Sequence, residues 1–62
     1  MWKIVKSSDN QHIGELVNIP SNHGDLVFED GDAVYLTEIK LVDSNTVTLI
    51  STNCIFTAVK VV

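Results

Sequence analysis

Asp25-Leu26-Val27-Phe28-Glu29-Asp30-Gly31-Asp32 is the stretch that decides the fold. Its first half has the apolar, β-favouring composition of a strand. Asp30-Gly31 is a strong hairpin signal, because the two central residues of a tight hairpin turn both need positive φ. A long apolar run, Ala33 to Val42, follows the turn. We therefore expect a β-hairpin with a two-residue turn that pairs Phe28 with Ala33.

The turn has a second interpretation. A two-residue turn sets Glu29 opposite Asp32, and like charges in such a pair are unfavourable. A longer loop, in which Asp32 leads into the next strand, avoids that pair. The stretch holds four of the eight acidic residues. Carboxylates suit Ca²⁺ or Mg²⁺, but the spacing does not match a calcium-binding loop, so we expect a solvated turn and no metal.

The remaining sequence also predicts short strands. Nine Val, six Ile and five Thr outnumber two Ala, and β-branched residues favour strands over helices. The expected strands cover residues 2–6, 12–19, 25–29, 33–42, 46–51 and 54–62. Because no segment remains for crossover helices, the sheet should be antiparallel. We predict an all-β fold: one domain over residues 1–62, forming a small, strongly curved antiparallel barrel of five to six short strands without substantial helix. It would be SH3-like or Sm-like, with an OB-like barrel as the alternative.

The size of the chain predicts a homo-oligomer. A 62-residue domain buries only about 60% of its unfolded surface, and a single cysteine excludes an intrachain disulfide. The predicted last strand, 54–62, is apolar on both faces, so we expect it to lie at a sheet edge covered by another copy. The N-terminal lysines are not followed by the apolar segment of a signal peptide, and no run reaches the ~18–20 apolar residues of a membrane span. We expect a cytoplasmic protein without a membrane role.

The charge disfavours nucleic-acid binding. The net charge is −4, and the basic residues are four lysines without any arginine. Nucleic-acid sites rely on arginine for bidentate contacts and on a basic face for affinity. Such a role would require an oligomer that gathers the lysines on one surface.

Two segments resemble the motifs of Sm-like (LSm) proteins. Gly14-Glu15-Leu16, Ile19 and Asp25 to Asp30 are similar to the first motif, and Ile50 to Ile55 is similar to the second. The resemblance implies a bent five-stranded barrel that assembles into rings and binds RNA. Asp25 stands where the family has an RNA-contacting Asn, and Ser51-Thr52 replaces Arg-Gly. These departures argue against the RNA role.

No residue pattern predicts catalysis, a metal or a cofactor. His12, His23 and Cys54 lack the paired spacing of zinc ligands. Cys54 is followed by Ile55 and Phe56, so we interpret it as a small core residue rather than a nucleophile. We expect no enzyme, no cofactor and no catalytic residues.

We expect instead a non-enzymatic, self-associating protein–protein interaction module with a protein partner. Small acidic chains of this kind are common in phages and mobile elements, which we expect as the source. The alternatives are an Sm-like ring protein that binds RNA or single-stranded DNA, and an acidic inhibitor of a nucleic-acid-binding protein. Trp2 is expected at the interface, because an N-terminal strand often lies at a sheet edge and interfaces are rich in aromatic residues. The full candidate interface is Trp2, Tyr35, Phe56, Val59, Val61 and Val62, and the candidate loop site is His23 and Asp25.

Overall fold

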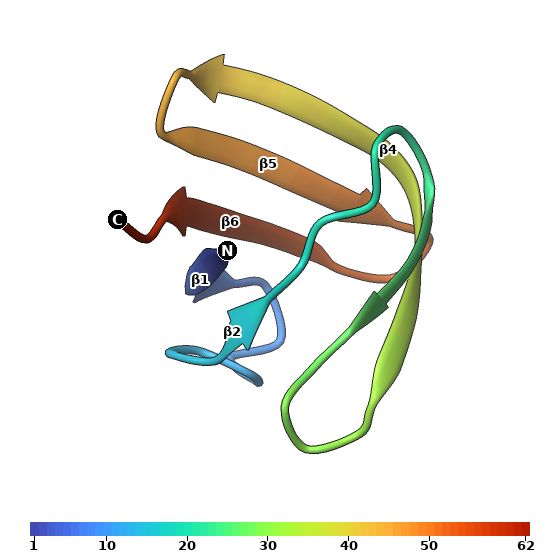
Figure 1. Ribbon diagram of the computed structural model, residues 1–62. Coiled ribbons are helices and arrows are strands. Elements are labelled where there is room, and N and C mark those ends of the chain that lie inside the picture. The colour runs from blue at the N-terminus through green and yellow to red at the C-terminus, as the bar shows by residue number, and fades with distance from the viewer.

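The computed structural model describes all residues, 1–62, and contains six antiparallel strands and no helix. The strands are β1 (Trp2–Ser7), β2 (Leu16–Val17), β3 (Gly24–Val27), β4 (Ala33–Asp43), β5 (Thr46–Ser51) and β6 (Ile55–Lys60). They form one sheet in the order β2-β1-β6-β5-β4-β3. The sheet curls so that it encloses the interior (Figure 1), which confirms the predicted small, strongly curved antiparallel barrel. With no helix present, none is long and apolar enough to cross a membrane.

The core consists of apolar side chains that every strand contributes to the inside of the curl. Phe56, on the central strand β6, is the largest of the fully buried side chains. On β4, Leu36 is fully buried, whereas Tyr35 beside it points outward. The nine buried apolar residues are Ile4, Val17, Leu26, Phe28, Leu36, Val47, Leu49, Phe56 and Ala58. This single cluster accounts for the closed curvature of so small a sheet.

The hairpin between β3 and β4 uses the longer turn. The Phe28 N–H donates to the Asp32 carbonyl at 2.8 Å, and the Gly31 N–H donates to the Phe28 carbonyl at 3.0 Å. Gly31 has φ +93°, as expected for a three-residue hairpin loop that ends in a left-handed residue. The predicted pairing of Phe28 with Ala33 is therefore wrong by one residue, because Val27 is the residue opposite Ala33.

The predicted strand 12–19 is almost entirely irregular. Only Leu16–Val17 pairs with β1 as a regular strand. The backbone before it has positive φ at Asn10, His12 and Gly14, which an extended strand does not allow. The segment still follows β1, since Gly14 and Glu15 exchange backbone hydrogen bonds with Ile4.

A bulge divides β4 into two parts. The register with β5 shifts between Leu36 and Glu38, so the extra residue, Thr37, reverses the alternation of side chains. Leu36 and Ile39 consequently both face the interior, although an unbroken strand would place them on opposite faces. This explains why apolar residues occur at both odd-numbered and even-numbered positions along this strand.

Two expectations about sheet edges are wrong. β6, predicted to be an exposed edge strand, lies between β1 and β5, and β1 lies between β2 and β6. The apolar residues on the inner face of β6 therefore pack in the core of the same chain and need no second copy to bury them. The edge strands are β2 and β3, which are the two shortest strands.

Candidate functional site

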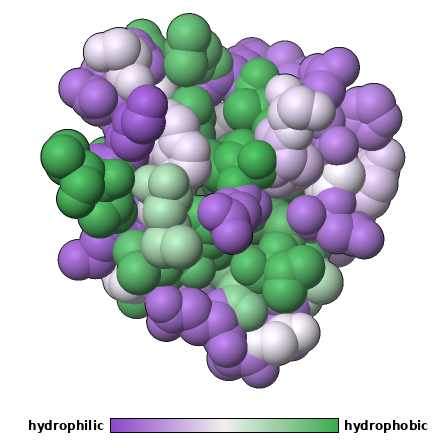
Figure 2. Space-filling model, in the orientation of Figure 1, coloured by the Kyte–Doolittle hydropathy of each residue, from purple (hydrophilic) through white to green (hydrophobic).

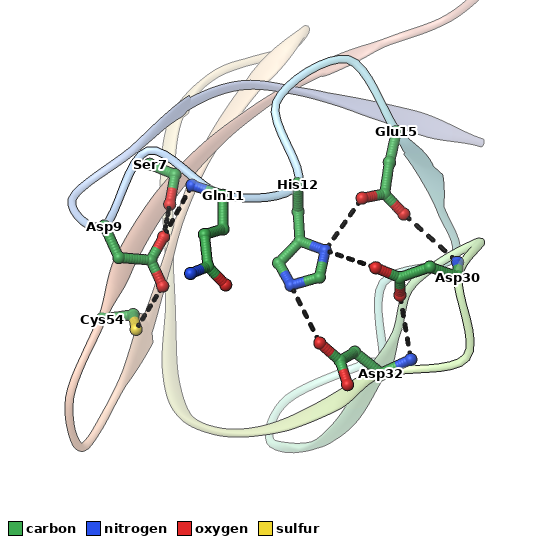
Figure 3. A network of polar contacts seen from close by, with 8 residues as sticks. All are labelled: Ser7, Asp9, Gln11, His12, Glu15, Asp30, Asp32 and Cys54. Carbon is green, nitrogen blue, oxygen red and sulfur yellow. Dashed lines mark hydrogen bonds and ion pairs between the residues drawn. The ribbon is translucent and has the colours of Figure 1, made fainter.

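Side-chain contacts join the segment before edge strand β2 to the turn after edge strand β3. We call this region the seam; it consists of His12, Glu15, Phe28, Asp30 and Asp32. The His12 ring, whose side chain is only 7% exposed, stacks on Phe28 with ring centroids 3.8 Å apart. Figure 3 shows Glu15 and Asp30 beside one ring nitrogen of the imidazole and Asp32 beside the other. The seam therefore links the segment before β2 to the hairpin that follows β3.

Three carboxylates surround the imidazole. Nδ1 of His12 lies 2.8 Å from Oε2 of Glu15 and 3.4 Å from Oδ2 of Asp30. Nε2 lies 3.4 Å from Oδ2 of Asp32. The other oxygen of Glu15, Oε1, accepts a hydrogen bond of 3.4 Å from the Asp30 backbone N–H. Both ring nitrogens thus face negative charge, an arrangement that favours the imidazolium form.

The pKa of His12 reflects this arrangement. Burial of the ring alone would lower the pKa, but the hydrogen bond to Glu15 and the charges of Asp30, Glu15 and Asp32 outweigh it and raise the pKa above 6.5. The buried ring therefore holds its proton more tightly than a free histidine.

His12, Asp30 and Asp32 are the only three residues in the fold whose side chains lie close enough together to hold a metal ion. One ligand atom from each of His12, Asp30 and Asp32 lies within 4.8 Å of the others. A divalent cation held there would need the neutral imidazole, because a protonated ring has no lone pair for a metal. The acidic surroundings favour the protonated form, so the geometry is better explained by ion pairing than by metal binding.

A second polar cluster lies at the turn after β1 (Figure 3). Asp9 accepts hydrogen bonds from the Ser7 hydroxyl, the Gln11 backbone N–H and the Cys54 thiol. The bonds from Ser7 and Gln11 lower the pKa of Asp9. The thiol bond to Asp9, 3.3 Å long, together with burial raises the pKa of Cys54 above 9.0.

This environment disfavours Cys54 as a nucleophile. The thiol lies beside the only pocket of the fold, an open hollow of about 330 Å³ that Tyr35 and Asn53 also line. A reactive cysteine needs an electropositive environment that stabilises the thiolate. Here a carboxylate is the nearest polar group, so the pocket has no activated nucleophile.

One side of β4 has no strand partner beyond Leu36. β3 pairs with β4 only over residues 33–36, whereas β5 pairs with its other side from Leu36 to Asp43. We call residues 38–42 the free edge. Within it, Glu38 to Leu41 pair with β5 alone, and Val42 lies at a second shift of register without a ladder partner. Figure 1 shows the later part of β4 forming the outer margin of the sheet, with no strand beyond it. Leu41 is 75% exposed and Val42 is 61% exposed.

The predicted interface residues do not form one surface. Phe56 is 1% exposed, so its assignment to an interface is wrong: it points into the barrel, where it packs near Phe28. Trp2 is half-buried against the core, and Tyr35 is 55% exposed on the outer face. Val59 is half-buried, while Val61 and Val62 are exposed beyond the end of β6.

The predicted loop site lies on the outer side of β3. Asp25 is opposite Tyr35 in the ladder, and His23 meets the edge of the Tyr35 ring with centroids 6.4 Å apart. The structure therefore brings His23, Asp25 and Tyr35 together. It places them away from the seam, and no ion pair joins His23 to Asp25.

Sequence reasoning missed the seam and the free edge. Positions 12 and 15 were assigned to a strand, which would put their side chains on opposite faces, and neither was connected with the turn at residues 30–32. The only signal for the irregular backbone was Gly14. The exposure of Leu41 has no sequence signal, because it depends on where β3 stops pairing.

Comparisons with protein-family models, with curated proteins and with solved structures found no match to this chain.

Proposed function

We propose that the protein is a non-enzymatic interaction module that self-associates and binds protein through the free edge of β4. The observation that carries this proposal is the one-sided pairing of residues 38–41 in the free edge, which also presents the exposed side chains of Leu41 and Val42. An unpaired strand edge is a template for an added strand, and many recognition modules bind an extended segment in this way.

The distribution of apolar surface supports the free edge, rather than a broad apolar patch, as the binding surface. On the face seen in Figure 2, hydrophobic residues reach the surface near the middle and at the margin, with polar residues between them. Divided apolar surface of this kind is ordinary for a soluble domain. A strand edge offers main-chain hydrogen bonds in addition, and its neighbouring side chains supply specificity.

Lysine at the free edge provides the test, because charged residues on an edge strand block strand addition. We expect wild-type protein to show a mass above that of the monomer by light scattering, and Leu41→Lys with Val42→Lys to reduce it to the monomer. Ile55→Lys is the matched control, since Ile55 is also about half exposed but lies on β6. Monomeric wild-type protein, or equal loss of association in the control, would contradict the proposal.

Nucleic-acid binding is a second candidate, supported by one observation. Lys40, Thr48, Thr57 and Lys6 form a continuous row across β4, β5, β6 and β1 through their ladder partners. Threonines and lysines of this kind contact phosphates. A fluorescence-anisotropy titration with single-stranded RNA at low salt checks it: binding that weakens with salt and with Lys6→Glu supports it, and the absence of binding excludes it.

A further inference from the structure

We propose that the partner strand is the same free edge of a second copy, paired antiparallel about a two-fold axis beside Ile39. This inference rests on the proposed function and names its partner and register.

Symmetry limits the registers available to such a dimer. Two identical antiparallel strands in one sheet are related by a two-fold axis normal to the sheet. Rotation about that axis does not exchange the two faces of the sheet, and residues directly opposite one another always share a face. The residue at the axis must therefore lie opposite its own copy. Within the free edge the central residue can be only one of residues 38–42.

The charges select among these registers. With Ile39 at the centre, Glu38 lies opposite Lys40 of the partner subunit, and the symmetric pair repeats the contact. A centre at Glu38 or at Lys40 sets two like charges opposite one another, which is unfavourable. Centres at residues 41 and 42 form no pair of opposite charges. The register centred on Ile39 is therefore the one that is electrostatically complementary.

The side chains required for this pairing are accessible. Glu38 and Lys40 are both exposed, and they share the outer face with their ladder partners Ile50 and Thr48. The two charges are neighbours on one face, so each can meet its counterpart across the new ladder.

The apolar residues fit the same register. Ile39 would lie beside its own copy on the inner face. Leu41 would lie just past the end of the new ladder, diagonal to the partner subunit's Ile39 and within reach of a long side chain. The dimer would thus cover Leu41, which is 75% exposed in the single chain.

A charge-swap experiment tests the register. In Glu38→Lys protein, each contact joins two lysines, and in Lys40→Glu protein it joins two glutamates. We expect each variant alone to dimerise about tenfold more weakly than wild type or worse. An equimolar mixture restores both opposite-charge contacts, so heterodimers should dominate in native mass spectrometry. The double variant Glu38→Lys/Lys40→Glu should dimerise like wild type.

The outcomes separate this inference from the proposed function. If Leu41→Lys with Val42→Lys abolishes association but the mixed single variants form no heterodimer, the free edge is used in another register and this inference fails alone. If wild-type protein is monomeric over the whole concentration series, both fail. Circular dichroism of each variant shows whether weakened association results from unfolding.

Discussion

The imidazole ring of His12 lies nearly parallel to the phenyl ring of Phe28, with ring centroids 3.8 Å apart and planes 8° apart. Phe28 is itself in the core, so the stack connects the seam directly to the centre of the barrel. A protonated imidazole on an aromatic face gains a cation–π contribution in addition to its ion pairs. The protonation state of one residue therefore contributes to the closure of the sheet.

Stability should fall as the pH rises from 6 to 8. The pKa of His12 is raised in the folded state, so its contribution is fully present below the unfolded value of about 6.5. It is lost as the pH rises through the raised folded-state pKa. Urea unfolding at a series of pH values should show this slope in wild-type protein and lose it in His12→Asn.

Asparagine suits this test because it tolerates the positive φ of position 12. At pH 6 we expect His12→Asn to cost about 1.5–3 kcal/mol, the range for hydrogen bonds to charged groups. His23→Asn is the matched control and should keep the slope. A His12→Asn protein with the wild-type slope would show that the seam does not depend on protonation.

Substitution of Gly31 should destabilise the protein because of its backbone conformation alone. A Cβ at this position would meet no atom within 4 Å, but φ is +93°, a conformation that costs an L-residue about 1–2 kcal/mol. We expect Gly31→Ala to lower the melting temperature by about 4–8 °C per kcal/mol lost. Gly31→Asn should lose less, because Asn adopts left-handed conformations more readily; equal losses would contradict this explanation.

Phe56 should determine folding rather than association. Truncation of a buried Phe to Ala typically costs about 3–5 kcal/mol, which is comparable with the whole stability of a domain of this size. We expect Phe56→Ala to be largely unfolded by circular dichroism. Tyr35→Ala, at an exposed aromatic residue, should change the free energy of unfolding by only about 0.5 kcal/mol. A folded Phe56→Ala monomer would restore its assignment to an interface.

Cys54 should react slowly with alkylating reagents until Asp9 is changed. The Asp9 carboxylate accepts the thiol hydrogen bond and raises the pKa of Cys54, so little thiolate is present near neutral pH. Asp9→Asn should lower that pKa and speed alkylation by iodoacetamide at pH 8. Asp43→Asn removes the same charge at the opposite end of β5, where Asp43 pairs with Thr46, and should leave the rate unchanged. Equal acceleration in both variants would point to net charge as the cause.

Local patterns predicted much of the fold. Thr46 to Ser51 was predicted with the observed bounds, because a run rich in β-branched residues lies between two turns that each contain Asn. The fold class followed from strand number and the absence of helix-forming segments. The hairpin register was missed by one residue, since the sequence Asp30-Gly31 suits both a two-residue turn and a three-residue loop.

The candidate site depends on tertiary geometry that no local pattern contains. His12 and Asp30 meet because the sheet curls through all six strands, and a spacing of 18 residues gives no sign of this. The bulge at Thr37 decides which residues of β4 face outward, and Thr is an ordinary strand residue. Phe56 was assigned to an interface because β6 was expected at an edge, whereas pairing with β1 makes it central.

The pairing of β1 with β6 also constrains how the protein folds. Trp2 lies opposite Lys60 in the ladder, so one of the two strands that flank β6 comes from the opposite end of the chain. β3 to β6 can form a local meander, whereas β1 must wait until β6 has been synthesised. Such non-local contacts slow folding. We therefore expect the nascent chain to leave β1 without its β6 partner until β6 has been synthesised, with closure of the barrel as the last step of folding.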